Sequence, residues 1–273
     1  MGRLLHLSDL HFGRERPELL DPLVQLCTDL CPDITVISGD LTQRARTGQF
    51  ASVAALIARL PGAVLSIPGN HDVPLYNPLA RLLTPFRAFR RAIGDQLEPM
   101  LETDDLRVVG MNTADPFAWQ RGVIRPAALD LACQRLRSAL PGQLRVVALH
   151  HPLVQPPRSG KTTMRGASAA TTALAQAGAD VVLCGHLHLW AVAPYAVEEG
   201  GRRMLCVQAG TTLSTRLRGE ENDLNLIEHV GSDVRITRYA TQTDTPGFAP
   251  EQVTVFHQHD TAAGWRHNDP NFA

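Results

Sequence analysis

The sequence predicts an α/β fold, α+β in some classifications, in which two β-sheets pack face to face and helices flank them. From Leu4 to Cys184, short apolar runs alternate with segments whose apolar residues recur at helical spacing. After Trp190, predicted strands follow one another across Gly, Asn and Asp turns, and no helical pattern lies between them. A βαβ half followed by a β-rich half indicates two packed sheets within one domain.

Six apolar runs in the first half are predicted to be strands buried on both faces, because they show no polar alternation. They span residues 4–7, 34–37, 63–67, 108–111, 146–149 and 181–184. The helices between them are expected at residues 17–30, 48–60, 126–140 and 168–178, with Pro126 in a first turn and Gly178 as a cap. The later strands are expected at residues 191–196, 204–208, 224–229 and 234–239.

Two segments depart from this pattern. Residues 77–105 form an irregular insert with a helical stretch near residues 86–93, which we expect to act as a cap over a site. Its apolar residues are spaced as a helical stripe that packs on the domain; they are Leu79, Leu82, Leu83, Phe86 and Phe89. The domain is expected to cover residues 1–240, and the polar, proline-containing residues 241–273 a loosely packed C-terminal tail.

The overall composition is that of a soluble globular protein. Apolar residues make up 44% of the chain, and its formal net charge of −1 provides no overall basic field for nucleic acid or an anionic membrane. No apolar run approaches the roughly 20 residues of a membrane span, and the first residues contain no apolar signal region. Five scattered cysteines are typical of a reducing compartment, so we expect a cytoplasmic protein.

Polar residues follow five of the predicted strands at their carboxyl ends, where α/β sheets bind ligands. These residues are Asp9 and His11, Asp40, the Asn70-His71-Asp72 run, His150 with His151, and His186 with His188. Asp-x-His and His-x-His spacing would put both side chains on one face of a strand. Gly39, Gly69 and Gly185 would let the backbone turn sharply at these ends.

Carboxylate, imidazole and amide groups without thiolate suit Mn²⁺, Fe or Zn²⁺. Seven candidate ligands exceed what one ion takes, so two divalent or mixed-valence ions are expected, bridged by Asp40. The seven candidates are Asp9, His11, Asp40, Asn70, His150, His186 and His188. His151 is expected either to contact and orient the ligand His150, or to be partly exposed in an orientation set by Pro152.

The order and spacing of these residues resemble the signature of the calcineurin-like metallophosphoesterases. The motifs are Asp9-x-His11, Gly39-Asp40, Gly69-Asn70-His71-Asp72, His150 and Gly185-His186-x-His188, and the resemblance covers roughly residues 3–230. It is greatest to the bacterial class III cyclic nucleotide phosphodiesterases, whose pattern the segment at residues 209–219 also fits. The resemblance implies a helix-flanked β-sandwich with two metals. Asp9, His11, Asp40 and His188 would hold the first, and Asp40, Asn70, His150 and His186 the second.

The resemblance also implies a catalytic role for His71, which would face the substrate. Two metals would share Asp40 and a bridging hydroxide that attacks the phosphorus in line with the leaving oxygen. We expect His71 to protonate that oxygen, oriented by Asp40 or Asp72. Asn112, Arg158 and Arg216 are candidate substrate-binding residues.

The predicted substrate is a small phosphodiester such as a 3′,5′-cyclic nucleotide. Alternatives are a nucleotide-sugar-lipid pyrophosphatase, for which the insert would supply an apolar channel, and a DNA repair nuclease, which the near-neutral charge disfavours. A metal-binding interaction module is least favoured, because binding alone would not require His71. A homodimer through residues after Leu205 is a further expectation.

Overall fold

The computed structural model describes residues 1–155, 162–196, 203–242, 247–260 and 264–267. Its helices are α1 (Leu20–Leu30), α2 (Thr47–Ile57), α3 (Pro78–Leu83), α4 (Arg87–Ala92), α5 (Pro126–Arg137) and α6 (Ala167–Gln176), with 3-10 turns at Pro17–Leu19 and Asn70–Asp72. The strands of the first half are β1 (Gly2–Leu7), β2 (Ile34–Ile37), β3 (Ala63–Ser66), β4 (Met100–Glu102), β5 (Leu106–Met111), β6 (Leu144–Leu149) and β7 (Val181–Cys184). The later strands are β8 (Ala191–Ala196), β9 (Arg203–Gln208), β10 (Asp223–Val230), β11 (Asp233–Thr241), β12 (Phe248–Asp260) and β13 (Gly264–His267).

The strands form two mixed sheets flanked by helices, which confirms the predicted fold class. One sheet has the order β3-β2-β1-β10-β11-β12, and the other has the order β13-β9-β7-β6-β5-β4 with β8 paired to β9. The strands β1, β2 and β3 run parallel, as do β5, β6, β7 and β9. Short β13 pairs with β12 and touches β9, so the two sheets are hydrogen-bonded along one edge.

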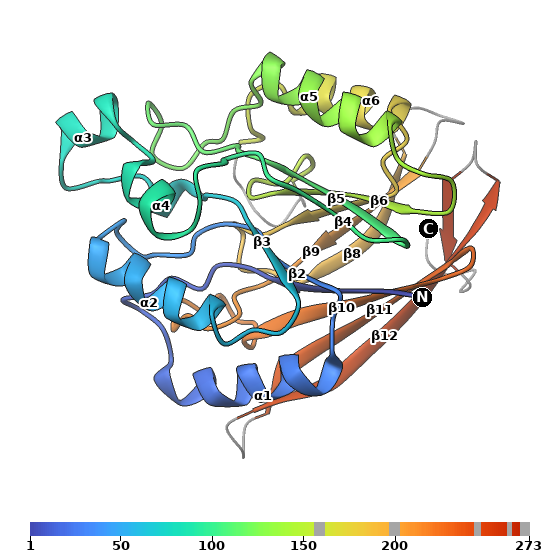
Figure 1. Ribbon diagram of the computed structural model, residues 1–273, viewed down its shortest axis with the longest axis horizontal. Coiled ribbons are helices and arrows are strands. Elements are labelled where there is room, and N and C mark those ends of the chain that lie inside the picture. The colour runs from blue at the N-terminus through green and yellow to red at the C-terminus, as the bar shows by residue number, and fades with distance from the viewer. Residues whose placement is uncertain (156–161, 197–202, 243–246, 261–263, 268–273) are drawn as a thin grey trace.

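Three apolar layers hold this arrangement together. The central layer lies between the sheets and takes side chains from both, such as Leu4 and Ile34 from one and Val146 and Val181 from the other. The second layer packs α1, α2 and α4 on the first sheet, and the third packs α5 and α6 on the second. Figure 1 shows α1 and the pair α5 and α6 on opposite sides of the strands. Because the central strands are covered on both faces, their sequences are mainly apolar: β7 is Val-Val-Leu-Cys, and β2 has one polar residue, Thr35.

The insert differs from the prediction in two ways. Its last part is not a cap, because β4 pairs with β5 at the edge of the second sheet. The prediction that these apolar residues form one helical stripe packed on the domain is also wrong: Phe86 and Phe89 are buried, but the three leucines on α3 are exposed. The chain turns at Thr84 between α3 and α4, so the residues do not belong to one continuous helix.

The prediction of a loose tail after residue 240 is wrong for the residues that the structure describes there. β12 pairs with β11 along most of its length, and Phe256 and Trp265 are buried in the central layer. Buried residues alternate only in the middle of β12: Thr254 and Phe256 are buried, while residues 250–253 are all exposed. A strand with one solvated face tolerates many polar residues, which explains why the composition suggested a tail. Among the described helices, none has the length and apolar character needed to cross a bilayer.

Candidate metal centre

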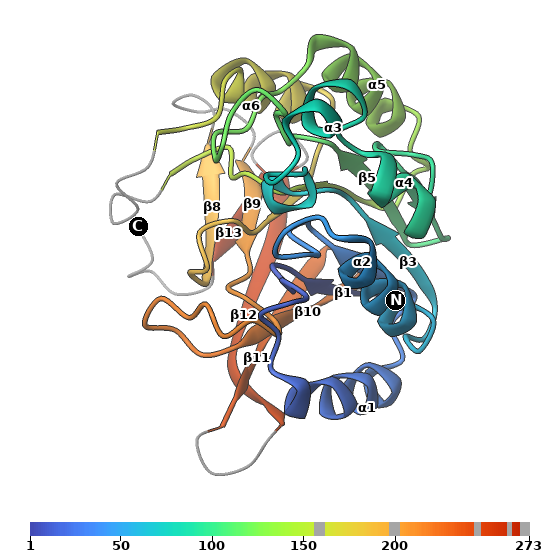
Figure 2. The same cartoon turned by 90° about the vertical axis from the view of Figure 1, so that its left-hand side faces the viewer.

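The carboxyl ends of the parallel strands in both sheets meet at one edge of the molecule, and Figure 2 looks onto this edge. The first sheet delivers Asp9 and His11 after β1, Asp40 after β2 and Asn70 after β3. The second sheet delivers His150 after β6, and His186 and His188 after β7. All seven side chains are buried, and the ligand atoms of six of them, all but Asn70, fall into overlapping groups within 4.8 Å although they come from segments far apart in the sequence.

Five of these seven residues have left-handed backbone conformations. The φ angles are 51° at Asp9, 48° at His11, 50° at Asp40, 70° at His186 and 56° at His188. Such conformations cost about 1–2 kcal/mol for a residue with a Cβ, and they persist where the surroundings hold them. The Asp-x-His and His-x-His pairs therefore lie in turns after β1 and β7. The expectation that strand geometry puts them on one face is wrong.

The first cluster consists of Asp9, His11, Asp40 and His188. The Nε2 atoms of His11 and His188 are 3.2 Å apart, and that of His188 is also 3.2 Å from Oδ1 of Asp9. Oδ2 of Asp40 lies 3.6 Å from Nε2 of His11. His188 donates its Nδ1 hydrogen to the backbone oxygen of Arg216 at 2.7 Å, which leaves the lone pair of Nε2 facing the cluster.

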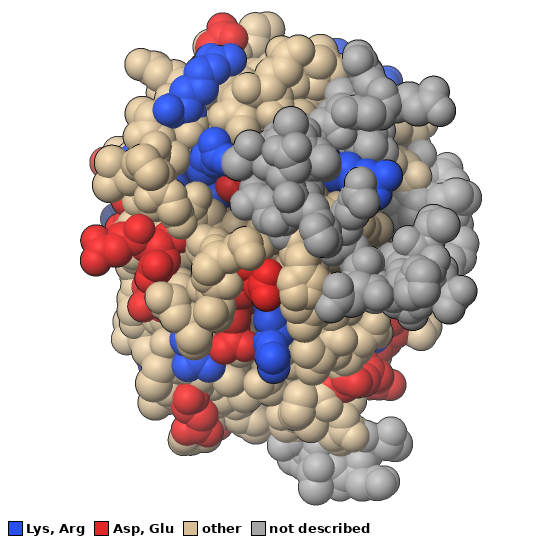
Figure 3. All heavy atoms as spheres, turned by 90° about the vertical axis from the view of Figure 1, so that its right-hand side faces the viewer, with Lys and Arg blue, Asp and Glu red and all other residues tan. Residues whose placement is uncertain are grey.

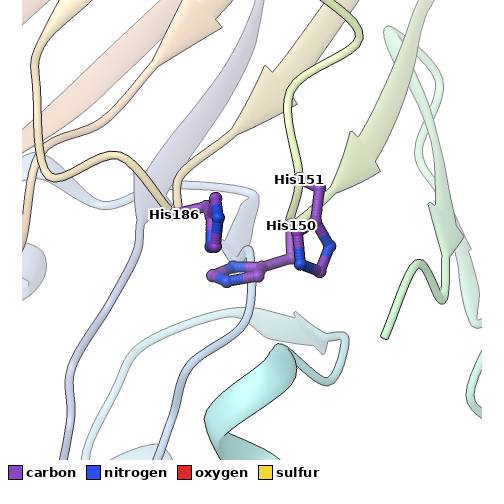
Figure 4. Close-up of side chains that lie close together, drawn as sticks. All are labelled: His150, His151 and His186. Atoms are coloured by element: carbon purple, nitrogen blue, oxygen red, sulfur yellow. The ribbon is translucent and has the colours of Figure 1, made fainter. Parts of the chain in front are cut away.

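The second cluster lies on the other side of Asp40. Oδ1 of Asp40 is 3.3 Å from Nε2 of His150, and Nδ1 of His150 donates to the backbone oxygen of Ser38 at 2.9 Å. Figure 4 shows His150, His151 and His186 close together, with the ring centroids of His151 and His186 4.5 Å apart. One nitrogen from each of these three rings lies within 4.8 Å of the others, so His151 stands beside two predicted ligands although it was not itself among them.

The buried polar atoms of both clusters fit divalent cations. Among the described residues, Oδ1 of Asp9, Oδ1 of Asn70 and Nε2 of His150 make no hydrogen bond of acceptable geometry. A buried acceptor without a donor is costly unless a cation lies nearby. Three further sets of ligand atoms also lie within 4.8 Å of one another: Asp9, His11 and His188; Asp9, Asp40 and His150; and His11, Asp40 and His71.

The charges of the site favour a cation as well. Burial alone would raise the pKa values of Asp9 and Asp40, but the adjacent His188 and His150 outweigh it and hold both pKa values well below their usual range. Burial likewise opposes the charged form of His150, yet Asp40 raises the pKa of His150 to about 9. The two carboxylates therefore attract positive charge strongly, and a metal cation would take the place of the proton.

A chain of buried hydroxyls orients Asp9. Ser8 donates to Oδ2 of Asp9 at 2.6 Å, Ser38 donates to Ser8 at 2.8 Å, and Nε2 of His6 lies 2.8 Å from the Ser38 hydroxyl. Burial lowers the pKa of His6 to about 3 despite the opposing charge of Asp9, so this ring stays neutral. These three residues were not among the predicted site residues. The only available signal was that Ser8 and Ser38 each precede a ligand segment after a strand.

Glycines allow the ligand loops to approach one another. Gly39 has a φ of +97°, and a Cβ there would lie 2.7 Å from Nδ1 of His150. Gly69 and Gly185 have no positive φ; instead, a Cβ would collide with Asp40 at Gly69, and with Ser8 and Asp9 at Gly185. The expected sharp turn is therefore present at Gly39. At Gly69 and Gly185, the missing side chain instead lets neighbouring loops pack closely against the backbone.

His71 is half-buried at the rim of the first cluster. Its Nδ1 donates to the backbone oxygen of Gln43 at 2.9 Å, and its Nε2 lies 3.1 Å from Nη1 of Arg216. The prediction that a carboxylate orients this ring is wrong, because Asp72 instead accepts hydrogen bonds from Thr42 and from the backbone of Gly69. Asp40 does accept from the backbone N–H of His71, at 2.8 Å.

The candidate substrate-binding residues have different placements. Arg216 lies at the site, with Nη1 3.4 Å from Nε2 of His11. Asn112 is buried, and its side-chain oxygen accepts from the backbone of Ala114 at 2.9 Å, within the turn that follows β5. Arg158 lies outside the described residues.

Residues 2–189 match the family model described as calcineurin-like phosphoesterase. The chain belongs to this family. Family membership and the Asp/His clusters together support a metal-dependent phosphoesterase activity. No curated protein matches the chain in sequence.

One solved structure shows the same fold at low sequence identity. A purple acid phosphatase from yellow lupin, Lupinus luteus, superposes with a TM-score of 0.70 at 13% identity, over 93% of this chain and 53% of the lupin chain. This chain thus spans about half the length of the lupin protein. Vps29 from Chaetomium thermophilum is 12% identical over 94% of this chain and 97% of its own, with a TM-score of 0.49.

Proposed function

We propose that this calcineurin-like phosphoesterase is a binuclear phosphodiesterase that hydrolyses a small phosphodiester, and that 3′,5′-cyclic nucleotides are its first candidate substrates. The observation that carries the binuclear proposal is the position of Asp40. Its Oδ2 lies 3.6 Å from His11 and its Oδ1 lies 3.3 Å from His150, so one carboxylate serves two imidazole clusters. A bridging carboxylate between two sets of ligands favours two ions over one.

The two ions would be Mn²⁺, Fe or Zn²⁺, held by the ligand sets that the sequence predicts. The first set is Asp9, His11, Asp40 and His188, and the second is Asp40, Asn70, His150 and His186. Bound there, the ions would lower the pKa of water to make a nucleophile and offset negative charge on the phosphoryl group.

Arg216 and His71 are the residues of this chain that would meet the substrate. The guanidinium of Arg216 is half-buried beside the first cluster and pairs with no carboxylate among the described residues, so it can bind a phosphoryl oxygen. His71 is held through Nδ1 by Gln43, so Nε2 is the atom that would pass a proton to the leaving oxygen. An anionic substrate oxygen between Nε2 and Arg216 would accept from both groups.

The pyrophosphatase alternative is supported by one observation. The backbone oxygen of Trp119 accepts from Nδ2 of Asn70 at 3.4 Å, and the Trp119 ring is largely exposed. An aromatic surface therefore borders the candidate site, as a substrate with an apolar portion would require.

The test combines a substrate panel with two variants. Metal-free protein would be reconstituted with Mn²⁺ and given 3′,5′-cyclic AMP, a 2′,3′-cyclic nucleotide, an aryl phosphodiester and a nucleotide-sugar lipid. We expect 3′,5′-cyclic AMP to be cleaved well above the aryl diester. Cleavage of the aryl diester alone would exclude the cyclic nucleotide assignment, and preferential cleavage of the nucleotide-sugar lipid would favour the alternative.

The variants separate metal binding from proton transfer. Asp40→Ala should lose bound metal and activity together, because both clusters lose a shared ligand. His71→Ala should keep wild-type metal content and lose about 10²–10⁴-fold in turnover, the usual contribution of a general acid. Metal loss in His71→Ala, measured by elemental analysis after dialysis, would contradict its placement outside the ligand set.

A further inference from the structure

Helix α3 has the reverse of the polarity expected for a helix on a water-exposed surface. Its only charged residue, Arg81, points inward and donates to the backbone oxygens of Pro74 and Ala118 at 3.3 and 2.6 Å. Its three leucines point outward, with exposed fractions of 71% at Leu79, 52% at Leu82 and 76% at Leu83. A helix that needed only to pack on the domain would place these residues the other way round.

The loop after β5 extends this apolar surface. The guanidinium of Arg81 lies 5.9 Å from the centroid of the Trp119 ring, which ties the loop to α3. Trp119 and Phe117 are 72% and 79% exposed. Together with the three leucines and Tyr76, they form what we term the apolar rim: Tyr76, Leu79, Leu82, Leu83, Phe117 and Trp119.

The apolar rim is a concentration rather than a scatter of exposed residues. Across the described chain, twelve large hydrophobic residues are exposed, and six of them belong to these two short segments. Single exposed leucines are ordinary, but a contiguous apolar group rimmed by polar residues marks an interaction site.

The charges around the apolar rim are mainly basic. Arg87, Arg90 and Arg91 on α4 are exposed, and within the described part of the chain none of them forms an ion pair. Leu83 shares a hollow with all three and with one acidic residue, Asp95, so three positive charges face one negative charge there. Tyr76 shares a second hollow, of about 580 Å³, with Arg87 and Arg91. On the face shown in Figure 3, by contrast, acidic and basic side chains are interspersed.

We propose that the apolar rim and these three arginines dock the protein onto an anionic lipid surface. Aromatic and leucine side chains enter the boundary between headgroups and acyl chains, and flanking arginines bind anionic headgroups. A second copy of this chain fits the surface less well, because pairing two rims would bring like-charged arginines together. Since Asn70 contacts Trp119, docking would hold the candidate metal centre close to the lipid surface.

The proposal does not depend on any catalytic activity and is tested by sedimentation with vesicles. The full chain would be spun with vesicles of phosphatidylcholine alone and of phosphatidylcholine mixed with phosphatidylglycerol. We expect sedimentation with the mixed vesicles only, and less of it as salt increases. The double variant Leu79→Ser/Leu83→Ser should bind at least tenfold more weakly, and Arg90→Gln/Arg91→Gln should lose the preference for phosphatidylglycerol.

Leu140→Ser is the matched control, because Leu140 is 59% exposed and lies outside the apolar rim. It should bind vesicles as the wild type does. The proposal is overturned if wild-type protein sediments with neither kind of vesicle, or if Leu140→Ser loses binding as fully as the double variant. It is also overturned if the wild type is a dimer by light scattering and the double variant is a monomer without lipid, because the rim would then join two copies.

Discussion

Individual atoms at the metal centre are placed by contacts that leave no room for an added methyl group. Gly185 has no side chain, and the space that a Cβ would take is filled by the Ser8 hydroxyl and Oδ2 of Asp9. The backbone N–H of the next residue, His186, donates to that same oxygen at 2.9 Å. The orientation of Asp9 thus depends on how closely the loop after β7 approaches the loop after β1.

Gly185→Ala should therefore weaken metal binding while leaving the ligands themselves intact. The new Cβ has to displace Ser8 or Asp9, and disturbing a group that orients a ligand typically costs 10–100-fold in metal affinity. Titration calorimetry of metal-free protein with Mn²⁺ would measure this. Gly48→Ala is the control, because a Cβ at Gly48 meets nothing within 4 Å. Equal Mn²⁺ affinity in the two variants would show that close approach at Gly185 is unimportant.

Residue types and spacing were sufficient to select the seven buried candidate ligands, but not their backbone conformations. Asp and His adopt left-handed φ values more often than most residues with a Cβ, but such values remain uncommon, so residue type alone does not indicate them at His11 or His188. The hydroxyl chain from His6 through Ser38 to Ser8 was likewise hidden, because it depends on the register between β1 and β2. Contacts across strands follow from the assembled sheet and cannot be read from one segment.

At the scale of elements, strands with both faces covered were easy to predict and strands with one solvated face were not. β7 is apolar throughout, β2 is apolar except for Thr35, and both begin and end at the predicted residues. β12 was missed because buried residues alternate only in its middle, and α3 was misjudged because its leucines face solvent. A hydrophobic pattern identifies an apolar face, but it does not reveal whether that face meets the core or something outside the chain.

Asp223, the first residue of β10, links three elements and should make stability depend on pH. It accepts hydrogen bonds from the backbone of Gly210 at 2.8 Å and from Arg238 of β11 at 2.9 Å. Burial raises the pKa of Asp223 to about 7, although Arg238 acts in the opposite direction. The unfolded chain has an Asp pKa of about 3.9. Between about pH 4 and 7 the folded protein therefore holds a proton that the unfolded chain lacks, and this contribution to stability falls as pH rises.

Asp223→Asn should remove that pH dependence. The slope lost should be no more than about 1.4 kcal/mol per pH unit, the value for one proton. Urea unfolding at a series of pH values between 4.5 and 7.5 measures it, and Asp21→Asn serves as the control because the Asp21 side chain is 87% exposed. An unchanged slope in Asp223→Asn would mean that Asp223 is ionised throughout this range.

At the scale of the whole molecule, the two sheets are joined along one edge by β13. This strand pairs with β12 of the first sheet and contacts β9 of the second. Its Trp265 is 1% exposed, packs in the central layer between the sheets and donates from Nε1 to the backbone oxygen of Asp180 at 2.9 Å. The candidate ligands follow strands of both sheets, so whatever fixes the sheets relative to each other also positions the candidate metal centre.

Trp265→Ala should destabilise the protein by about 3–5 kcal/mol, the usual cost of removing a large aromatic side chain from a core. Urea unfolding followed by circular dichroism would measure the change. Val253→Ala is the control: Val253 lies on neighbouring β12 and is 53% exposed, so the variant should stay within about 0.5 kcal/mol of the wild type. Because the sheets would be less firmly held, Trp265→Ala should also bind Mn²⁺ more weakly under conditions in which it remains folded. Wild-type stability in Trp265→Ala would show that the apolar layer between the sheets holds them together without β13.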